Sequence, residues 1–424
     1  MTPEVKKRIE QIRQGIVPEG YKKTESGIIP NEWRVEQVSK CIEEYKFFSN
    51  DISHIPVYSS SRKGLVPQSD YYNQREAVET NLGYKVVPQG YVTYRHMSDD
   101  DVFHFNINKT GENVLVSSEY PVFTSSDNCD LSFLISVLNN TARFRYFCKM
   151  QKLGGTRTRL YLDNLKRYAL ALPPFDEQKK IAEILSTQDK AIELQGRKID
   201  ELKRFKKGCL EKMFPRKGQK VPEKRFPGFT DDWEQRKLGG VTTSYSGGTP
   251  TVGVKEYYDG QIPFIRSAEI NSESTELFIS EKGLNVSSAR LVSKGDILYA
   301  LYGATSGEVG RARLEGAINQ AILAIKPMDN YDAEYLSQWL RKSKQNIVET
   351  YLQGGQGNLS GAIVKELIVD FPSYNEQQII GQYFANLDRL ITLHQRKLEE
   401  MKNQKKALMQ LLLTGIVKTK GEVR

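Results

Sequence analysis

The stretch Leu172-Pro-Pro-Phe-Asp-Glu-Gln178 stands immediately before a long helical pattern, and Phe371-Pro-Ser-Tyr-Asn-Glu-Gln377 stands before a second pattern of the same kind. The two stretches are 199 residues apart, and this offset continues without a gap through both helical patterns, pairing Asp189 with Asp388. The chain therefore contains an internal duplication. A duplicated fold is suited to a partner that offers two binding sites, one for each copy.

Both helical patterns carry apolar residues at alternating spacings of three and four, which is the repeat of a coiled coil. Polar residues interrupt the repeat at matching places, Gln195 with His394 and Lys206 with Lys405. Polar residues there lower stability but fix the register, which predicts that the two helices pack on each other. A globular domain separates the copies, so antiparallel pairing is the easier one to close. We call the apolar positions the seam; they are Ile181, Leu185, Ile192, Ile199 and Leu202, and Ile380, Phe384, Ile391, Leu398 and Met401.

The first helix is long enough to act as a ruler. At ~1.5 Å per residue, a helix of about 33 residues spans on the order of 50 Å.

The composition predicts a globular protein with an anionic partner. The 424 residues suffice for two or more domains, and the net charge of +9 favours nucleic acid. No apolar run reaches the ~20 residues of a membrane span, and the charged N-terminus does not resemble a signal peptide. Four cysteines without CxxC spacing and four histidines without an HxxxH pair predict reduced thiols and no metal site. We therefore expect a cytoplasmic protein without membrane contact.

The expected fold class is α+β, with two pseudo-symmetric α/β domains joined by two long antiparallel coiled-coil helices. Short β-like runs separated by turns fill both domains, with helical stretches from Leu131 to about Tyr146 and from Ala333 to Lys342. The expected segments are an N-terminal helix and connector (1–30), a first domain (31–172), a first helix (173–214), a linker (215–228), a second domain (229–371), a second helix (372–415) and a basic tail (416–424).

Nothing in the sequence predicts catalysis by this chain alone. Leu172-Pro-Pro-Phe175 is one residue away from the [Asn/Asp]-Pro-Pro-[Phe/Tyr] loop of amino-methyltransferases, but leucine cannot accept a hydrogen bond from a base's amino group. No Phe-x-Gly-x-Gly cofactor loop precedes it, and a proline stop before a helix explains the motif. We assign no catalytic residue and no metal ligand.

Loops of both domains carry residue types that contact DNA. Small residues let a backbone approach phosphates, while Arg, Asn and Gln can read base edges. Each such loop taken alone is more often a surface turn. The candidates are Ser60, Arg62, Lys63, Arg95, His96, Thr156, Arg157 and Arg159 in the first domain, and Gly248, Thr249, Arg266, Thr305, Asn319, Gln320, Gln356 and Asn358 in the second.

Taken together, these features resemble the specificity (S) subunit of type I restriction–modification systems, over nearly the whole chain. The resemblance is carried by the repeated Pro-x-x-x-Glu-Gln before each helix, by Arg225-Phe-Pro-Gly-Phe-Thr-Asp-Asp-Trp233, and by Ser246-Gly-Gly-Thr-Pro250 with Ile262-Pro-Phe-Ile-Arg266. It implies two target-recognition domains, each reading one half of a bipartite, asymmetric DNA site, and helices that set the spacer between the halves. Because Pro56 to Gly64 has no counterpart in the second domain, the two half-sites are expected to differ.

The resemblance also implies partners for this chain. These are double-stranded DNA, two modification (methyltransferase) subunits docked on the helices, and restriction (motor/nuclease) subunits. S-adenosylmethionine, ATP and Mg are then expected on those subunits, and no cofactor on this non-catalytic chain. Two alternatives remain open, a coiled-coil scaffold that binds only proteins and a self-sufficient adenine methyltransferase, against which Leu172 argues.

Overall fold

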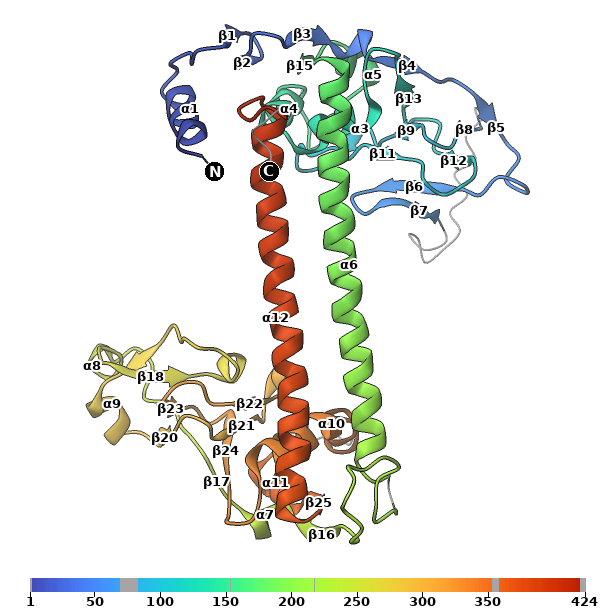
Figure 1. The fold of residues 1–424 in the computed structure, drawn as a ribbon. Helices are drawn as coiled ribbons and strands as arrows, with labels where there is room; N and C mark the ends of the chain where they lie inside the picture. The colour runs from blue at the N-terminus through green and yellow to red at the C-terminus, as the bar shows by residue number, and fades with distance from the viewer. Residues whose placement is uncertain (1, 69–82, 153, 217, 353–357, 420–424) are drawn as a thin grey trace. The chain divides into compact units, whose positions relative to one another are not determined.

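The computed structural model describes residues 2–68, 83–152, 154–216, 218–352 and 358–419. The chain forms two compact units, residues 1–194 with 397–424 (unit 1) and residues 195–396 (unit 2). Each unit contains one α/β domain and a part of each of the two long helices, α6 (Phe175–Met213) and α12 (Tyr374–Leu413), as Figure 1 shows.

Unit 1 is built on a four-stranded antiparallel sheet. Its strands lie in the order β11 (Asn106–Ile107), β9 (Val92–Thr93), β13 (Val122–Ser125) and β4 (Ile42–Glu44). A second sheet contains β12 (Val114–Val116), β8 (Tyr84–Val87) and β5 (Phe48–Ser49). The remaining strands pair two by two: β1 (Tyr21–Thr24) with β2 (Gly27–Pro30), β3 (Arg34–Gln37) with β15 (Ala169–Leu172), β6 (Tyr58–Ser61) with β7 (Gly64–Pro67), and β10 (Met97–Ser98) with β14 (Thr158–Arg159).

The core of unit 1 is shared between the domain and the long helices. The domain's helices are α1 (Pro3–Arg13), α3 (Leu131–Asn140), α4 (Ala142–Lys149) and α5 (Leu162–Lys166). One hydrophobic cluster contains Phe133 of α3, Phe123 of β13, Ile181 and Leu185 of α6, and Leu412 of α12. The first turns of α6 and the last turns of α12 are therefore part of this domain's core.

Unit 2 repeats this plan. Its main sheet has the order β17 (Thr242–Ser246), β24 (Ile322–Pro327), β21 (Ile297–Ala300) and β22 (Val309–Arg311), which matches β4, β13, β9 and β11 of unit 1. Beside it lie a sheet of β19 (Phe278–Ile279), β18 (Ile262–Ile265), β23 (Gly316–Ile318) and β20 (Arg290–Val292), the pair β16 (Glu234–Lys237) and β25 (Ile368–Phe371), and helices α7 (Leu238–Val241), α8 (Lys255–Tyr258), α9 (Glu281–Asn285), α10 (Ala333–Leu352) and α11 (Gly361–Glu366). Tyr335 of α10, Phe214, and Ile380 and Phe384 of α12 share its core.

The long helices begin where the sequence places proline. Pro174 and Pro372 lie just before α6 and α12, where a missing backbone N–H costs nothing because the first helical N–H groups have no intrahelical partner. Acidic residues fill the first turns, Asp176 and Glu177 in α6 and Glu376 in α12, which suits the positive end of the helix dipole. The helices therefore start at matching points of the duplicated sequence.

The predicted seam lies on the inner faces of these helices. Six of its ten residues are buried and four are partly buried. Within unit 2, Gln195 lies opposite His394, Lys206 opposite Asp388 and Cys209 opposite Tyr383, so one residue number rises as the other falls. The helices are antiparallel.

The polar seam residues form specific contacts. The side-chain amide nitrogen of Gln195 lies 2.9 Å from Nδ1 of His394 and donates to its carbonyl oxygen at 2.8 Å. Nζ of Lys206 donates to both carboxylate oxygens of Asp388, at 2.6 and 2.7 Å. The equivalent residues of unit 1, Lys405 and Asp189, form the same kind of ion pair. Each helix copy thus supplies one lysine and one aspartate.

A buried glutamine joins each long helix to its domain. The amide of Gln178, 1% exposed, donates to the carbonyl oxygens of Pro173 (2.9 Å) and Asn128 (3.3 Å) and accepts from the backbone N–H of Asp130 (2.8 Å). Asp130 in turn caps the N-terminus of α3. We call this arrangement the glutamine clamp of unit 1.

Unit 2 contains the matching clamp. Gln377, 2% exposed, donates to Pro372 (2.9 Å) and Asn330 (3.4 Å) and accepts from Asp332 (2.9 Å), which caps α10 by accepting from the N–H of Tyr335. The glutamine of the duplicated Glu-Gln motif therefore fixes each long helix to its domain.

The structure differs from the sequence interpretation at three places. The connector within residues 1–30 contains the β1–β2 hairpin, whose turn uses Gly27 at a φ of 105°, and its short charged strands hide the β signal. The helical stretch expected from Leu131 to Tyr146 is divided at Thr141, whose extended backbone and capping hydroxyl start α4. The helix expected to end at Lys342 continues to Leu352.

All four cysteines are free, with Cys209 partly buried and the other three buried. In the described part of the chain, no helix is both long and apolar enough to cross a membrane.

Candidate nucleic-acid interface

The tip of the β6–β7 hairpin carries two predicted contacts, Arg62 and Lys63. Ser61 pairs with Gly64, so these two residues form the whole loop, and Gly64 adopts a φ of 113° that favours glycine. Oγ of Ser61 donates to the carbonyl of Gly64 (2.9 Å) and accepts from the N–H of Lys63 (3.1 Å). The hairpin therefore presents two cations on a tight, hydrogen-bonded turn.

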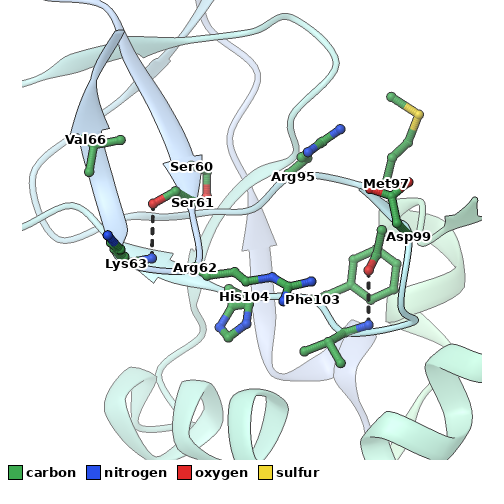
Figure 2. A pocket seen from close by; sticks show the side chains of 12 residues that line it. Ser60, Ser61, Arg62, Lys63, Val66, Arg95, Met97, Asp99, Phe103 and His104 are labelled. Carbon is green, nitrogen blue, oxygen red and sulfur yellow. Dashed lines mark hydrogen bonds between the residues drawn. The ribbon is translucent and has the colours of Figure 1, made fainter. Parts of the chain in front are cut away.

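A cavity of about 490 Å³ lies next to this tip (Figure 2). The guanidinium of Arg62 lies 2.6 Å from a carboxylate oxygen of Asp100, and Figure 2 shows its side chain beside the ring of His104. The other side chains that line the cavity are those of Ser60, Ser61, Lys63, Val66, Arg95, Met97, Ser98, Asp99, Val102 and Phe103.

Strand β14 brings further predicted residues to the same loop. Arg159 pairs with Met97, and Nε of Arg157 donates to Asp99 at 2.8 Å, while the neighbouring Thr156 is exposed. Together with Arg62, Lys63 and Arg95, these side chains surround the loop of residues 97–104 although they come from three separate stretches of sequence. Unit 1 thus gathers most of its candidates in one place.

Two candidates of unit 1 are buried instead. Ser60 is 6% exposed, and its hydroxyl accepts from the amide of Asn106 (2.8 Å) and donates to the carbonyl of Thr93 (3.4 Å). His96 is 4% exposed, and its ring stacks on Tyr161 with centroids 5.5 Å apart. Both side chains therefore pack beneath the exposed candidates of unit 1 and are not themselves exposed to a DNA partner.

Burial and neighbouring groups lower the pKa of two ionisable side chains beside the cavity, Asp100 and His104. Burial opposes ionisation of Asp100, yet the hydrogen bond from Ser98 and the guanidinium of Arg62 together lower its pKa. Burial lowers the pKa of His104, and the positive charge of Arg62 lowers it further. The site therefore combines a carboxylate, a neutral imidazole and several guanidinium groups, which suits hydrogen bonding to bases and phosphates.

In unit 2, four candidates meet at the end of β23. A Cβ on Gly248 would lie 2.6 Å from Cβ of Ser288, so only glycine fits there. The hydroxyl of Thr249 donates to the side-chain oxygen of Gln320 at 2.5 Å, and Asn319 precedes Gln320. The Ser246–Pro250 loop therefore packs against the Asn319-Gln320 turn.

Two further candidates lie close to a different segment. The N–H of Leu359 donates to the carbonyl of Leu301 (3.1 Å), which places exposed Asn358 near the turn that contains Thr305. Gln356 lies outside the described residues. These positions do not join the Thr249–Gln320 group through any contact within the described chain.

Arg266 is engaged within the chain. Its guanidinium donates to Glu269 at 3.1 and 2.9 Å and to Glu276 at 2.8 Å. This hydrogen bonding lowers the pKa of Glu269 to about 2. Arg266 therefore buttresses its loop, and a base could use its donors only in competition with two carboxylates.

Sequence reasoning overlooked several residues. Asp99 and His104 line the cavity of unit 1, and Asp100 pairs with Arg62 beside it. The run Ser98 to Asp101 between two β-like stretches was an available signal. On the long helices, Leu194 and Leu393 are 63% and 55% exposed and are related by the 199-residue offset. The described residues contain no group of three or more His, Cys, Asp or Glu side chains arranged to hold a metal ion.

The family model of the type I restriction modification DNA specificity domain matches residues 38–204 and 230–403. These two matches cover both α/β domains and most of both long helices. The chain therefore belongs to this family, as a type I restriction–modification specificity subunit with two target-recognition domains.

Individual proteins agree with this assignment. The MjaX specificity subunit of Methanocaldococcus jannaschii is 24% identical over 432 aligned positions, which cover 95% of this chain and 97% of that protein. The S subunit structure from M. genitalium has a TM-score of 0.57 at 14% identity, covering 90% of this chain and 96% of that one. A chain from a structure of a type I R-M system has a TM-score of 0.55 at 15% identity, covering 92% of this chain and 99% of that one. The two structures share the fold.

Proposed function

We propose that the two target-recognition domains each read one half of a bipartite, asymmetric DNA sequence. The observation that carries this proposal is the contrast between the two units. Their main sheets have the same strand order, yet the candidate DNA contacts of unit 1 are mostly arginine and lysine side chains beside the loop of residues 97–104, while those of unit 2 include a Gly-Gly-Thr loop packed against Asn and Gln. A common scaffold with different surface chemistry is what two different half-sites require.

The two kinds of surface serve different parts of recognition. Lys63, Arg157 and Arg159 are exposed cations suited to phosphates, which gives salt-dependent affinity without sequence information. Asn319, Gln320 and Asn358 carry amides that can read base edges in the major groove. Lysine and arginine contacts therefore position the duplex, and the amides select its sequence.

The long helices then dock the modification subunits. Leu194 and Leu393 are equivalent large apolar residues of the two long helices, and both are more than half exposed. Single exposed apolar residues are common, so the docking role of this pair is supported by their recurrence at equivalent positions of the duplicated helices. One modification subunit binds at each leucine, and this chain contributes no catalytic group.

The chemistry belongs to the partners in this scheme. The modification subunits supply S-adenosylmethionine and methylate an adenine that is flipped out of the duplex into their own pocket. Restriction subunits, with ATP and Mg, join for cleavage. The specificity subunit determines where the complex acts.

The decisive experiment is methylation-aware sequencing of the host genome with the gene present and deleted. We expect one adenine-methylated motif, made of two unlike half-sites and a fixed spacer, that disappears on deletion. An unchanged methylome would contradict the proposal, and so would methyl transfer by the purified chain alone.

Docking is tested separately by Leu194→Glu and Leu393→Glu. Each single variant should bind one modification subunit where the wild type binds two, and the double variant should bind none, as measured by analytical ultracentrifugation. Each single variant controls for the other. Full stoichiometry in the double variant would show that the leucines are not the docks.

A further inference from the structure

Unit 2 contains a second cavity, of about 600 Å³, that none of the predicted DNA contacts lines. Leu393, proposed above as a docking residue, lies at its wall. Parts of β22, α10 and α12 line it. Three carboxylates, those of Glu308, Glu334 and Asp388, also line its wall. Its main feature is a set of five arginines: Arg311, Arg313, Arg341, Arg389 and Arg396.

Two of the three carboxylates are neutralised by lysines that do not line the cavity. Lys206 donates to Asp388 at 2.6 Å, and Lys344 forms an ion pair with Glu308. Glu334 lies 3.7 Å from the nearest guanidinium nitrogen of Arg311, which is longer than a charge-assisted hydrogen bond. Arg313 donates to Glu273 at 2.6 Å, and Arg396 lies 3.7 Å from the same carboxylate. With Glu273 counted, the positive side chains still outnumber the carboxylates, so the cavity has an excess of positive charge.

Two of the arginines have donors to spare. Nε and Nη1 of Arg311 are buried and have no hydrogen-bond partner among the described residues. Buried donors of this kind are unfavourable until an acceptor reaches them. Arg389 is exposed and forms no ion pair or hydrogen bond within the described part of the chain. An anion in the cavity would supply acceptors to both.

The lining selects the kind of anion. Arginine binds phosphate oxygens through paired N–H groups. No aromatic side chain is among the described residues that line the cavity, so it offers no stacking surface for a base. The chemistry fits a phosphate group whose base lies elsewhere.

The duplication argues for DNA and against an acidic segment of a partner protein. A partner that docks on both helix copies should find the same residues in both units. In unit 1, the residue nine positions after the capping Asp130 is Asn139, which is bonded to Phe105, whereas the residue nine positions after Asp332 is Arg341. On the long helices, Arg389 and Arg396 are matched by the cations Lys190 and Arg197. The α10 side of the cavity is therefore the part that is particular to unit 2, as a contact to one half of an asymmetric duplex would be.

We infer that this arginine cavity binds a backbone phosphate of the DNA, beside the bases that the unit 2 domain reads. The inference rests on the proposed function in taking duplex DNA as the partner. It adds an anchoring site that strengthens binding to any sequence and leaves base selection to the loops.

Arg389→Ala tests this inference in the complex with the modification subunits. Binding is measured by fluorescence anisotropy on a duplex with the methylated motif and on a scrambled duplex, between ~50 and ~200 mM salt. Both affinities should fall by the same factor, about tenfold. The slope of log affinity against log salt should become smaller by about one. Arg389→Lys should recover part of the loss.

Lys190→Ala is the matched control, because Lys190 occupies the equivalent position on α6. It should leave both affinities nearly unchanged. A loss confined to the motif duplex would overturn the inference, since it would mean base reading. Poorer incorporation of modification subunits, with or without a loss of DNA affinity, would also overturn it, in favour of a protein segment. A wild-type complex without preference for the motif would refute the proposed function, while an equal loss on both duplexes would still support the phosphate site.

Discussion

Replacing the clamp glutamines should loosen one unit at a time. Gln178→Ala removes three hydrogen bonds at a buried position and leaves the N–H of Asp130 and the carbonyl of Pro173 without their partner. Each hydrogen bond contributes about 1 kcal/mol net, and an unsatisfied buried group costs about 1–3 kcal/mol. With partial relaxation, we expect unit 1 to lose about 2–4 kcal/mol.

Hydrogen–deuterium exchange with peptide resolution measures this loss locally. A decrease of about 2–4 kcal/mol corresponds to roughly 30- to 700-fold faster exchange of protected amides. In Gln178→Ala the increase should appear in α3 and the first turns of α6. In Gln377→Ala it should appear in α10 and the first turns of α12.

Each variant is the control for the other, because the two clamps have nearly the same geometry. Equal acceleration in both units from a single substitution would refute the idea that each clamp acts within its own unit. No acceleration anywhere would show that the hydrogen bonds contribute nothing net to stability.

Three other outcomes are expected. A double-mutant cycle on Lys206 and Asp388, measured by urea denaturation, should give a coupling free energy of about 1–2 kcal/mol. The equivalent pair of unit 1, Lys405 and Asp189, is more exposed and should give ~0.5 kcal/mol. Equal coupling free energies would contradict the role of burial. A seven-residue insertion at matched points of both long helices adds ~10.5 Å, so the methylated motif should gain about three base pairs of spacer or be lost, and an unchanged spacer would refute the ruler. Arg266 lowers the pKa of Glu269 to about 2, so the ionised carboxylate stabilises unit 2 above its ordinary pKa, and this stabilisation is lost as the pH falls toward 2. Glu269→Gln should therefore flatten the pH dependence of the unfolding free energy in this range. An unaltered pH dependence would show that Glu269 does not cause it.

The parts of the fold that periodicity reports could be predicted from the sequence. Spacings of three and four report burial, so the pattern alone assigns Ile181, Leu185, Ile380 and Phe384 to the buried faces of the helices, and all four are buried. The contacts themselves depend on the register between the helices. Gln195 and His394 could be recognised as equivalent residues, but that they contact each other follows only from the three-dimensional pairing.

The candidate site was harder to predict because residue type reveals neither whether a side chain is exposed nor whether it already forms an ion pair within the protein. His96 and Arg62 both look like DNA contacts in the sequence, yet the first is buried under Tyr161 and the second lies at a hairpin tip. Arg266 is held by two carboxylates, one of them ten residues away. The arginine cavity collects side chains from β22, α10 and α12, and no local pattern joins them.

The glutamine clamps also bear on how this protein can evolve. Gln178, Pro173, Asn128 and Asp130 lie around the start of α6 and the start of α3, and none of the residues predicted to contact DNA is among them. Substitutions in the reading loops therefore leave the attachment of domain to helix intact. New target sequences can arise by drift or selection in the loops while the chain keeps its stability, and each domain can change its preference independently of the other.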